Sequence, residues 1–234
     1  MKVTLIGSGN VSTVLAKKIN DSGHDVLEIV ERNNHPVYES DLYIVAITDS
    51  ALDGIHKWLK LENKMVVHTA GSISKDVLRK VSKNYGVLYP LQSLRKDMNY
   101  LPEIPFFVDG NTPDDTAMIK DFAESISNKV IVGDDALRLK LHVAAVFVNN
   151  FVNHMYTLAE KFCEEEQIDF ALLKPLIDET ADRLAHGSPS NMQTGPAVRS
   201  DDITIEKHLK ILKHHKKHRK IYEALTESIR KFND

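Results

Sequence analysis

The sequence feature that most constrains the fold is a glycine turn placed directly after the first apolar run of the chain. Residues 2–6 form a short apolar run of the kind found in central parallel strands, which are covered on both faces. The turn begins at Gly7, and it is followed by a predicted helix over residues 11–20 and a second strand over residues 24–30. This order is the one required of a dinucleotide-binding βαβ unit.

Each position of the turn has a physical reason in nucleotide binding. Gly7 permits the tight turn, and Gly9 lets the backbone approach a pyrophosphate, whose charge then lies at the helix N-terminus. Ser12 stands where a third glycine or an alanine is usual, and a small residue there still permits close packing of helix on strand. The alternative is a glycine turn in a doubly wound domain that binds no nucleotide. The predicted cofactor-binding residues of the turn are Gly7, Ser8, Gly9, Asn10, Val11 and Ser12.

The end of the second strand carries two signals about the nucleotide. Glu31 could accept hydrogen bonds from a ribose diol, which favours NAD, whereas Arg32 could pair with a 2′-phosphate, which favours NADP. A glutamate would repel the phosphate unless it turned away. An arginine at a strand tip is otherwise only a solvated loop charge, so we predict NADP as the cofactor, with NAD as the alternative.

Composition excludes several classes of protein. The chain has 234 residues, 42% of them hydrophobic and 27% charged, which is an ordinary balance for a soluble protein. Its formal net charge of −3 argues against a nucleic-acid-binding protein, and no apolar run approaches the roughly 20 residues that span a bilayer. Met1 leads directly into a predicted strand, so no secretory leader is expected. With the single cysteine Cys163, this predicts a cytoplasmic protein without disulfides, and no metal site is expected.

Further strands bring more polar residues to the same edge of the predicted sheet. Strands are predicted over residues 42–48, 65–68 and 86–89, with a helix over residues 74–82 between the last two. Ligands of doubly wound sheets bind beyond the carboxyl ends of the strands. The residues expected to border the nucleotide are Thr48, Asp49, Ser50, Thr69 and Gly71. Asp49 or Ser50 could instead only cap a helix over residues 51–59. The candidate substrate-side residues are His68, Tyr89, Gln92 and Ser93, although a histidine at a strand end is often a structural residue.

The pattern of the chain changes near residue 133. A strand at 104–109, whose proline suits a sheet edge or a strand start, a helix at 114–126 and a strand at 129–132 complete the sheet. Only helical patterns follow. We therefore predict an α/β fold with a Rossmann-like, doubly wound, mostly parallel sheet in residues 1–133, and a second, all-α domain in residues 134–234.

A long helix predicted over residues 136–165 carries one polar stripe. At about 100° per residue, His142, Asn149, Asn153, Tyr156 and Glu160 fall within a narrow arc of an otherwise apolar helix. Such a stripe lines a cleft or faces water, and we predict the cleft for His142 and Asn149 and water for Glu160. Asn153 is a further candidate for substrate contact.

The rest of the helical region offers weaker signals. A helix is predicted over residues 168–186, with Pro175 starting a new helix or kinking this one. The turn-rich loop 187–196, which contains Thr194, and the following Arg199 could bind substrate, or Arg199 could simply tie the loop down through Asp201. The helical tail 206–232 contains a basic run over residues 213–220, which could be a phosphate, nucleic-acid or metal patch but more simply is a solvated helix face.

Taken together, these motifs resemble a known family. It joins a Rossmann-like NADP-binding domain to a C-terminal helical domain of uncharacterised role, within the broad 6-phosphogluconate dehydrogenase-like superfamily. The resemblance covers residues 7–12, 68–72, 89–93, 142–150 and 194–196, together with Arg199, Asp201, His208 and Leu209. It implies an oxidoreductase similar to pyrroline-5-carboxylate reductase, prephenate dehydrogenase and deazaflavin-dependent NADP reductase. It also implies a homodimer formed through the helical domain.

The sequence departs from its relatives at two places that bear on chemistry. Tyr89 replaces the histidine that is usual before the following proline. In the β-hydroxyacid dehydrogenases of the superfamily, a catalytic lysine precedes an asparagine by three or four residues, and the matching positions here are Ala145 and Val146. His142 is therefore the candidate proton donor, since histidine titrates near neutral pH, and Asn149 is placed beside it as catalytic.

Three hypotheses follow. The first is an NAD(P)-dependent oxidoreductase that transfers a hydride between nicotinamide and a small polar substrate at the interdomain cleft. The second is a catalytically inactive NAD(P)-binding sensor or interaction protein, which Val146 and Tyr89 favour. The third is a protein that binds a different phosphate ligand and neither nicotinamide cofactor.

Overall fold

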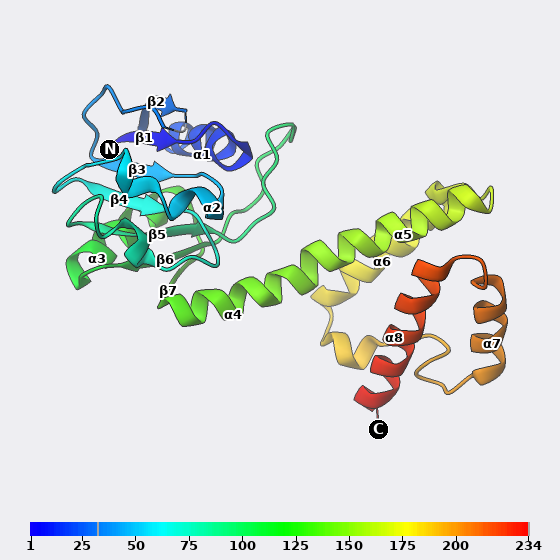
Figure 1. Ribbon diagram of the computed structural model, residues 1–234. Helices are drawn as coiled ribbons and strands as arrows, with labels where there is room; N and C mark the ends of the chain where they lie inside the picture. The colour runs from blue at the N-terminus through cyan, green and yellow to red at the C-terminus, as the bar shows by residue number, and fades with distance from the viewer. Residues whose placement is uncertain (32, 234) are drawn as a thin grey trace. The chain divides into compact units, whose positions relative to one another are not determined.

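The computed structural model describes residues 1–31 and 33–233, and it divides the chain into two compact units, Met1–Asn150 and Phe151–Asp234. The division falls inside one continuous helical stretch, after α4 and before α5 (Figure 1). The domain boundary that the sequence suggests near residue 133 stays a prediction.

The first unit is built on a seven-stranded sheet of order β2-β1-β3-β4-β5-β6-β7 within the described residues. Strands β1 to β5 are parallel along this order, β6 runs antiparallel to β5, and β7 is parallel to β6. The sheet is therefore mostly parallel. Its strands are β1 (Lys2–Ile6), β2 (Asp25–Val30), β3 (Leu42–Val45), β4 (Met65–His68), β5 (Tyr85–Pro90), β6 (Phe106–Gly110) and β7 (Val130–Val132).

Helices cover both faces of this sheet, because its central strands are apolar on both sides. On one face, α1 (Asn10–Asp21) and α3 (Pro113–Ile126) bury Leu15, Ile19 and Phe122 against the sheet. On the other face, α2 (Asp49–Leu52) and two 3₁₀ turns, Ile55–Lys57 and Lys75–Leu78, pack Leu52, Ile55 and Leu78 against Val45 and Val66. Near β5 and β6, Leu141 of α4 (Asp135–Ala145) packs on Val87, Tyr89 and Phe107.

The reversal of strand order occurs at β1, which lies between β2 and β3. Such a switch point is where doubly wound sheets bind their ligands. Gly7 follows β1 at this point with φ of 111°, and a Cβ there would lie 2.2 Å from the carbonyl oxygen of Ala46. Only glycine combines this backbone conformation with so close an approach to the end of β3.

A π-helical segment, Val146–Phe151, separates α4 from α5 (Val152–Glu165). Its i→i+5 bonding holds one residue more per hydrogen-bonded turn than an α-helix, so the helical phase changes here. The prediction of one continuous arc from His142 to Glu160 is therefore wrong, because it assumed about 100° per residue throughout. His142 and Asn149 lie before the division between the units, and Asn153 lies after it.

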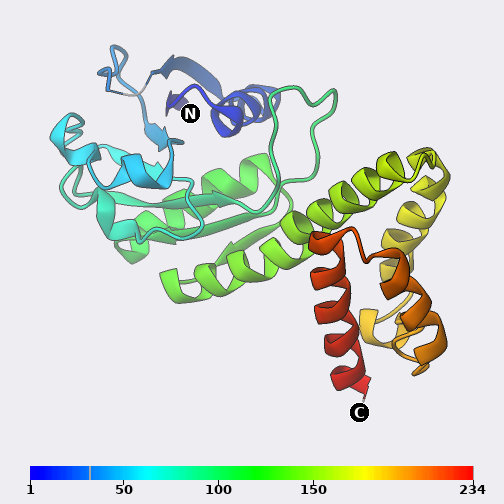
Figure 2. The same ribbon diagram turned by 45° about the vertical axis from the view of Figure 1, so that its right-hand side comes forward.

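The second unit consists of α5, α6 (Lys174–Asp182), α7 (Asp202–Ile211) and α8 (Lys216–Asn233), with short 3₁₀ turns between them (Figure 2). Its small core contains Leu158, Cys163, Ala197, Ile205 and Leu212. Polar contacts join its helices. Nε2 of His218 on α8 donates to the carbonyl of Leu158 on α5 at 3.0 Å, and the hydroxyl of Tyr222 on α8 lies 2.8 Å from Nδ1 of His208 on α7.

Several element boundaries differ from those expected. Residues 74–82 form only the 3₁₀ turn Lys75–Leu78, and the basic run lies across a break between α7 and α8 rather than inside one helix. The helix expected over 168–186 is broken into two 3₁₀ turns and α6, with Pro175 in the first turn of α6. Strand β6 lies between β5 and β7, and Pro105 immediately precedes it, so of the two alternatives for this proline the strand start, and not the sheet edge, is the one observed.

The fold class itself is confirmed as an α/β Rossmann-like sheet followed by a helical C-terminal part. Among the described helices, none combines the length and the apolar character that crossing a membrane requires.

Candidate functional site

The glycine turn is shaped to receive a phosphate group. Gly9 precedes α1 with extended backbone angles, and a Cβ built on it would meet nothing within 4 Å, so the space above the turn is open. The first N–H groups of this 12-residue helix point into that space. The residues present therefore fit a dinucleotide pyrophosphate.

The other residues of the turn differ in burial and in their contacts. Ser12 is completely buried, and its Oγ has no hydrogen-bond partner among the described residues, as expected of a position chosen for small size. The side-chain oxygen of Asn10 accepts the backbone N–H of Lys96 at 3.2 Å, which ties the loop after β5 to the start of α1. Ser8 is exposed at the turn.

Glu31 follows β2 immediately and is exposed, where a ribose would lie in a dinucleotide site. Arg32, on which the prediction of NADP depends, lies outside the described residues. Thr48, Asp49 and Ser50 are exposed after β3, and α2 starts at Asp49 instead of residue 51. Asp49 accepts a hydrogen bond of 2.6 Å from the hydroxyl of Ser72, so the loops after β3 and β4 are joined.

A cavity of about 580 Å³ lies in the first unit, beside the start of α1. It collects seven of the predicted site residues, from α1, from the carboxyl ends of β4 and β5, and from α4 with its π-helical continuation. The lining residues are Val11, Thr69, Tyr89, Pro90, Leu91, Gln92, Ser93, Leu141, His142, Ala144, Ala145, Val146, Val148, Asn149 and Asn150.

Tyr89 and His142 form a hydrogen-bonded pair in this cavity. The Tyr89 hydroxyl lies 2.9 Å from Nδ1 of His142, and the two rings meet edge to face with centroids 5.9 Å apart. Burial raises the pKa of the Tyr89 phenol, and the nearby Arg138 guanidinium opposes this rise. The phenol is therefore held in its protonated form, in which it can donate a hydrogen bond to the imidazole.

Gly71 supports this pair from behind. A Cβ at this position would lie 2.6 Å from Nδ1 of His142 and 3.1 Å from Cε2 of Tyr89. The backbone of the turn after β4 thus packs directly on both rings. Gly71 is buried and belongs to the wall behind the cavity, rather than to its surface.

The remaining walls are amide groups and apolar side chains. Gln92 is oriented by two contacts, since its Nε2 donates to the carbonyl of Glu103 at 3.1 Å and its Oε1 accepts the N–H of Ser93 at 2.9 Å. Asn149 and Asn150 come from the π-helical segment. Ala145 and Val146, the positions that match the superfamily's lysine, also line the cavity, so this wall carries no ammonium group.

Four predicted residues lie elsewhere. His68 is completely buried at the end of β4, its Nδ1 accepts the N–H of Ala70 at 3.2 Å, and burial lowers its pKa to about 4. Asn153, Thr194 and Arg199 belong to the second unit, where Thr194 borders an apolar cavity of about 330 Å³ between α5 and α8. Their roles in substrate binding stay predictions.

Sequence reasoning did not single out several residues around the cavity, among them Arg138, Leu141 and Asn150. Leu141 and Asn150 adjoin residues that were singled out. Arg138 lies four residues before His142, so helical spacing places it on the same side of α4, but a charged residue on a helix is ordinarily assigned to solvent. Within the described residues, no group of three or more His, Cys, Asp or Glu side chains could hold a metal ion.

Comparison with known proteins finds relatives for the whole chain. Residues 104–229, more than half of the sequence, match the family model described as "Domain of unknown function (DUF2520)". No curated protein matches the chain. Among solved structures, BF3122 from Bacteroides fragilis, named as an inferred NADP oxidoreductase, is 35% identical, with 98% of each chain covered and a TM-score of 0.89.

Two more distant structures share the fold. Protein TM1727 from Thermotoga maritima is 18% identical, with 98% of each chain covered and a TM-score of 0.79. The 1-pyrroline-5-carboxylate reductase of Streptococcus pyogenes is 14% identical, with a TM-score of 0.59, and the match covers 99% of this chain and 98% of that one.

Proposed function

We propose that this chain, which belongs to the family described as "Domain of unknown function (DUF2520)", is an oxidoreductase. Its cofactor is NADP. The glycine turn would hold the pyrophosphate, and the cavity beside it would hold the reacting groups. The resemblance to BF3122, whose name includes NADP, supports this choice of cofactor.

The observation that carries the proposal is the Tyr89–His142 pair in a cavity that begins at the glycine turn. Val11, in the first turn of α1, lines the same cavity as both rings. A dinucleotide whose phosphates rest on the N-terminus of α1 could therefore place its nicotinamide next to an acid–base pair. An empty doubly wound domain would need no such pair.

Bound NADP would supply the hydride acceptor or, when reduced, the hydride donor. The chain's own residues would manage the proton that accompanies the hydride. In the neutral tautomer whose Nδ1 accepts the Tyr89 hydroxyl, the ring proton lies on Nε2, from which it could pass to a substrate carbonyl or imine. The phenol proton could then move to Nδ1. The amides of Gln92, Asn149 and Asn150 would orient the substrate.

Cofactor binding is the first test. We expect calorimetric titration of the wild-type protein to show tighter binding of NADP than of NAD, and replacement of Arg32 by alanine to abolish the difference. Glu31→Gln tests the opposing signal at the neighbouring position, and it should strengthen the preference for NADP because it removes a charge that repels the 2′-phosphate. If neither nicotinamide cofactor bound, the oxidoreductase proposal would fail and the ligand of the turn would be a different phosphate compound.

Turnover is the second test. A panel of small ketones, imines and alcohols would be screened by the absorbance of reduced nicotinamide. For any substrate found, we expect His142→Ala to lower kcat by a factor on the order of 10² to 10⁴, typical of general acid–base catalysis, while NADP affinity changes little. Unchanged turnover in this variant would remove the proton-transfer role from His142.

A second candidate function is a sensor that binds NADP without catalysis. The apolar wall formed by Ala145 and Val146 favours it, because the superfamily's catalytic lysine has no counterpart there. The sensor would bind NADP as tightly as an enzyme, yet no member of the panel would change the redox state of the bound cofactor.

We further infer that the chain forms a homodimer through its helical region. In the second unit, Leu172, Leu176 and Ile203 are 72%, 61% and 71% exposed, although leucine and isoleucine are usually buried. Light scattering is expected to give the dimer mass for the wild-type protein and the monomer mass for the Leu172→Glu/Leu176→Glu double variant. Val37→Glu, at an apolar position 82% exposed in the first unit, should leave the mass unchanged.

A further inference from the structure

Arg138 is an arginine that is only 1% exposed, in the first half of α4. An ionised guanidinium is costly to bury, so its partners indicate what it is for. It forms an ion pair of 2.8 Å with Asp135. Its Nε also donates to the carbonyl of Gly71 at 3.3 Å, and its Nη2 donates to the carbonyl of Ile73. Both carbonyls belong to the turn after β4.

This turn is the one that packs on the reacting pair. A Cβ on Gly71 would collide with the imidazole of His142 and touch the ring of Tyr89. The residue whose carbonyl Arg138 holds is thus the residue against which both rings rest. Arg138 and His142 are four residues apart on α4, so the same helix carries the imidazole and the group that fixes the surface behind it.

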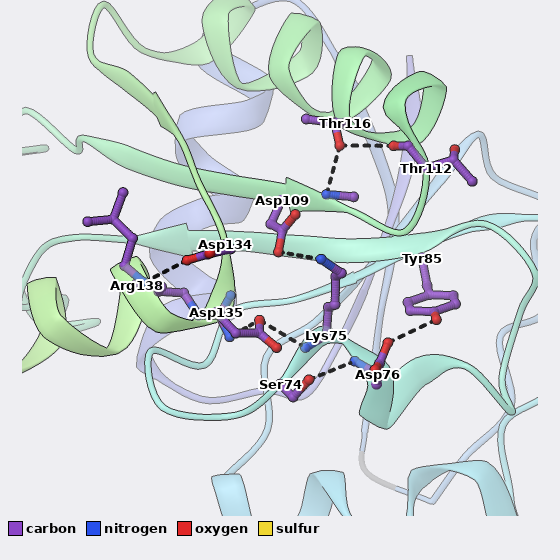
Figure 3. A network of polar contacts seen from close by, with 12 residues as sticks. Ser74, Lys75, Asp76, Tyr85, Asp109, Thr112, Thr116, Asp134, Asp135 and Arg138 are labelled. Carbon is purple, nitrogen blue, oxygen red and sulfur yellow. Dashed lines mark hydrogen bonds and ion pairs between the residues drawn. The ribbon is translucent and has the colours of Figure 1, made fainter.

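A network of polar contacts fixes the other end of the turn to the start of α4 (Figure 3). Asp135 accepts the backbone N–H of Lys75 at 3.3 Å, and Nζ of Lys75 forms an ion pair of 2.7 Å with Asp109 of β6. Asp134 caps α4 by accepting the N–H of Leu137 at 2.8 Å. Arg138 is therefore held at its base, and its planar fork can define where the turn lies.

The charge of Arg138 also reaches the pair. The guanidinium lowers the pKa of the Tyr89 phenol, against the larger effect of burial, which raises it. Nζ of Lys75, the other cation of the network, is instead paired with Asp109. Lys75 therefore offers a cation of the same network that holds a different part of the fold.

We propose that Arg138 is a positioning residue for the Tyr89–His142 pair, holding the Gly71–Ile73 turn so that the phenol and the imidazole stay in hydrogen-bond contact. Its consequence for proton transfer rests on the proposed function, but the geometric claim does not. Arg138 itself is not one of the residues that line the cavity.

The test follows the pair directly by NMR, without a substrate. Protein carrying ¹³C at the tyrosine Cζ and ¹⁵N in its histidines is titrated, with Tyr89→Phe and His142→Gln used to assign the signals. In Arg138→Gln we expect loss of the hydrogen-bonded ¹⁵N shift at Nδ1 of His142 and a pKa of Tyr89 above that of the wild type. In Arg138→Lys, which keeps the charge but not the fork, we expect loss of the hydrogen-bonded shift with a smaller rise in the pKa.

Lys75→Met is the matched control, because it removes a cation of the same network that does not contact the Gly71 carbonyl. It should leave both signals as in the wild type. If Arg138→Gln does not fold, Asp135→Asn, at a half-buried carboxylate, loosens the same guanidinium and is expected to weaken the hydrogen-bonded signal. Wild-type signals in the folded Arg138 variants, or in Asp135→Asn, would overturn the proposal. Failure to bind NADP would instead contradict the proposed function and leave this result standing.

Discussion

At the scale of single residues, Ser12 is a position where the native residue costs stability. Its hydroxyl is buried without a partner among the described residues, which costs about 1–3 kcal/mol of desolvation. We expect Ser12→Ala to raise the free energy of unfolding by about 1 kcal/mol, since part of the gain is offset by the small void. Urea denaturation measures it.

Ser12→Ala should also leave NADP affinity unchanged, because alanine is accepted at the third position of the glycine turn. Thr13→Ala is the control, since the Thr13 hydroxyl is exposed and bonds the carbonyl of Gly9 at 3.1 Å. A Ser12→Ala variant less stable than the wild type would show that the hydroxyl has a hydrogen-bond partner in solution.

Gly71 is a position where substitution should lower stability, because a larger side chain has no room. Its φ is not positive, so the backbone would accept alanine, and the cost comes from the collision of the added Cβ with His142. We expect Gly71→Ala to cost about 1–3 kcal/mol of stability, as overpacking does. We also expect it to break the Tyr89–His142 hydrogen bond, seen in the ¹⁵N shift of Nδ1. Gly54→Ala is the matched control, because a Cβ there meets nothing within 4 Å.

At the scale of elements, helices and strands were predicted correctly where neighbouring residues alone determine them. The strand Met65–His68 was expected at its observed bounds, because a run of four apolar or aromatic residues between turns leaves little choice. Residues 74–82 were expected to be a helix. Ser74 does cap a turn there, through the N–H of Asp76 at 3.3 Å, but four residues of 3₁₀ structure suffice to bury Leu78 against the sheet.

The same limit applies to the site. Tyr89 and His142 were each singled out, one as the end of a strand and the other from a helix stripe, yet nothing local says that they touch. Their contact depends on where α4 packs against β5, which is a tertiary property set by Leu141, Val87 and Phe107. Arg138 escaped notice for the same reason, since only the fold shows that its guanidinium is buried.

The π-helical segment supports a prediction at this scale. Because i→i+5 bonding holds one residue more per turn, deletion of Val148 should let Val146–Phe151 close as an ordinary α-helix. Val148 is 75% exposed, so its loss removes little packing. We expect the protein to remain folded and to bind NADP, while the amides of Asn149 and Asn150 turn away from the cavity. Turnover of any substrate would fall by on the order of 10²-fold, as misplacement by about 1 Å can cause.

A crystal structure of the deletion variant, with circular dichroism as a first check on folding, would show whether the bulge closes. Replacement of Val148 by alanine is the matched control, because it keeps the residue count. Persistence of the π-helical bonding one residue further along would contradict the expectation.

At the scale of the whole molecule, the two units should respond to pH in opposite directions. In the first unit, burial lowers the pKa of His68 to about 4, compared with 6.5 when unfolded. The unfolded state binds the proton first as pH falls, so this stabilisation is complete above pH 6.5 and is lost towards pH 4. At about 1.4 kcal/mol per unit, the first unit should lose about 2 kcal/mol between pH 6.5 and about 5. Hydrogen exchange of β4 and β5 measures it, and His68→Gln should flatten the response.

The second unit contains a histidine, His215, whose pKa is shifted in the opposite direction. Nε2 of His215 bonds a carboxylate oxygen of Glu166 at 2.8 Å and Nδ1 bonds one of Glu165 at 2.7 Å, and these bonds raise its pKa above 6.5. The stabilisation from protonated His215 is complete below its pKa in the unfolded state, and it is lost as the pH rises through its pKa in the folded state. We therefore expect protection of the α5 end and the α8 start, corrected for intrinsic exchange rates, to fall as the pH rises above the unfolded pKa of 6.5. His215→Gln should remove the pH dependence, and His214→Gln, at the neighbouring exposed position, should retain it. A pH response shared by both units would show that they unfold as one cooperative body, and that their histidines cannot be separated in this way.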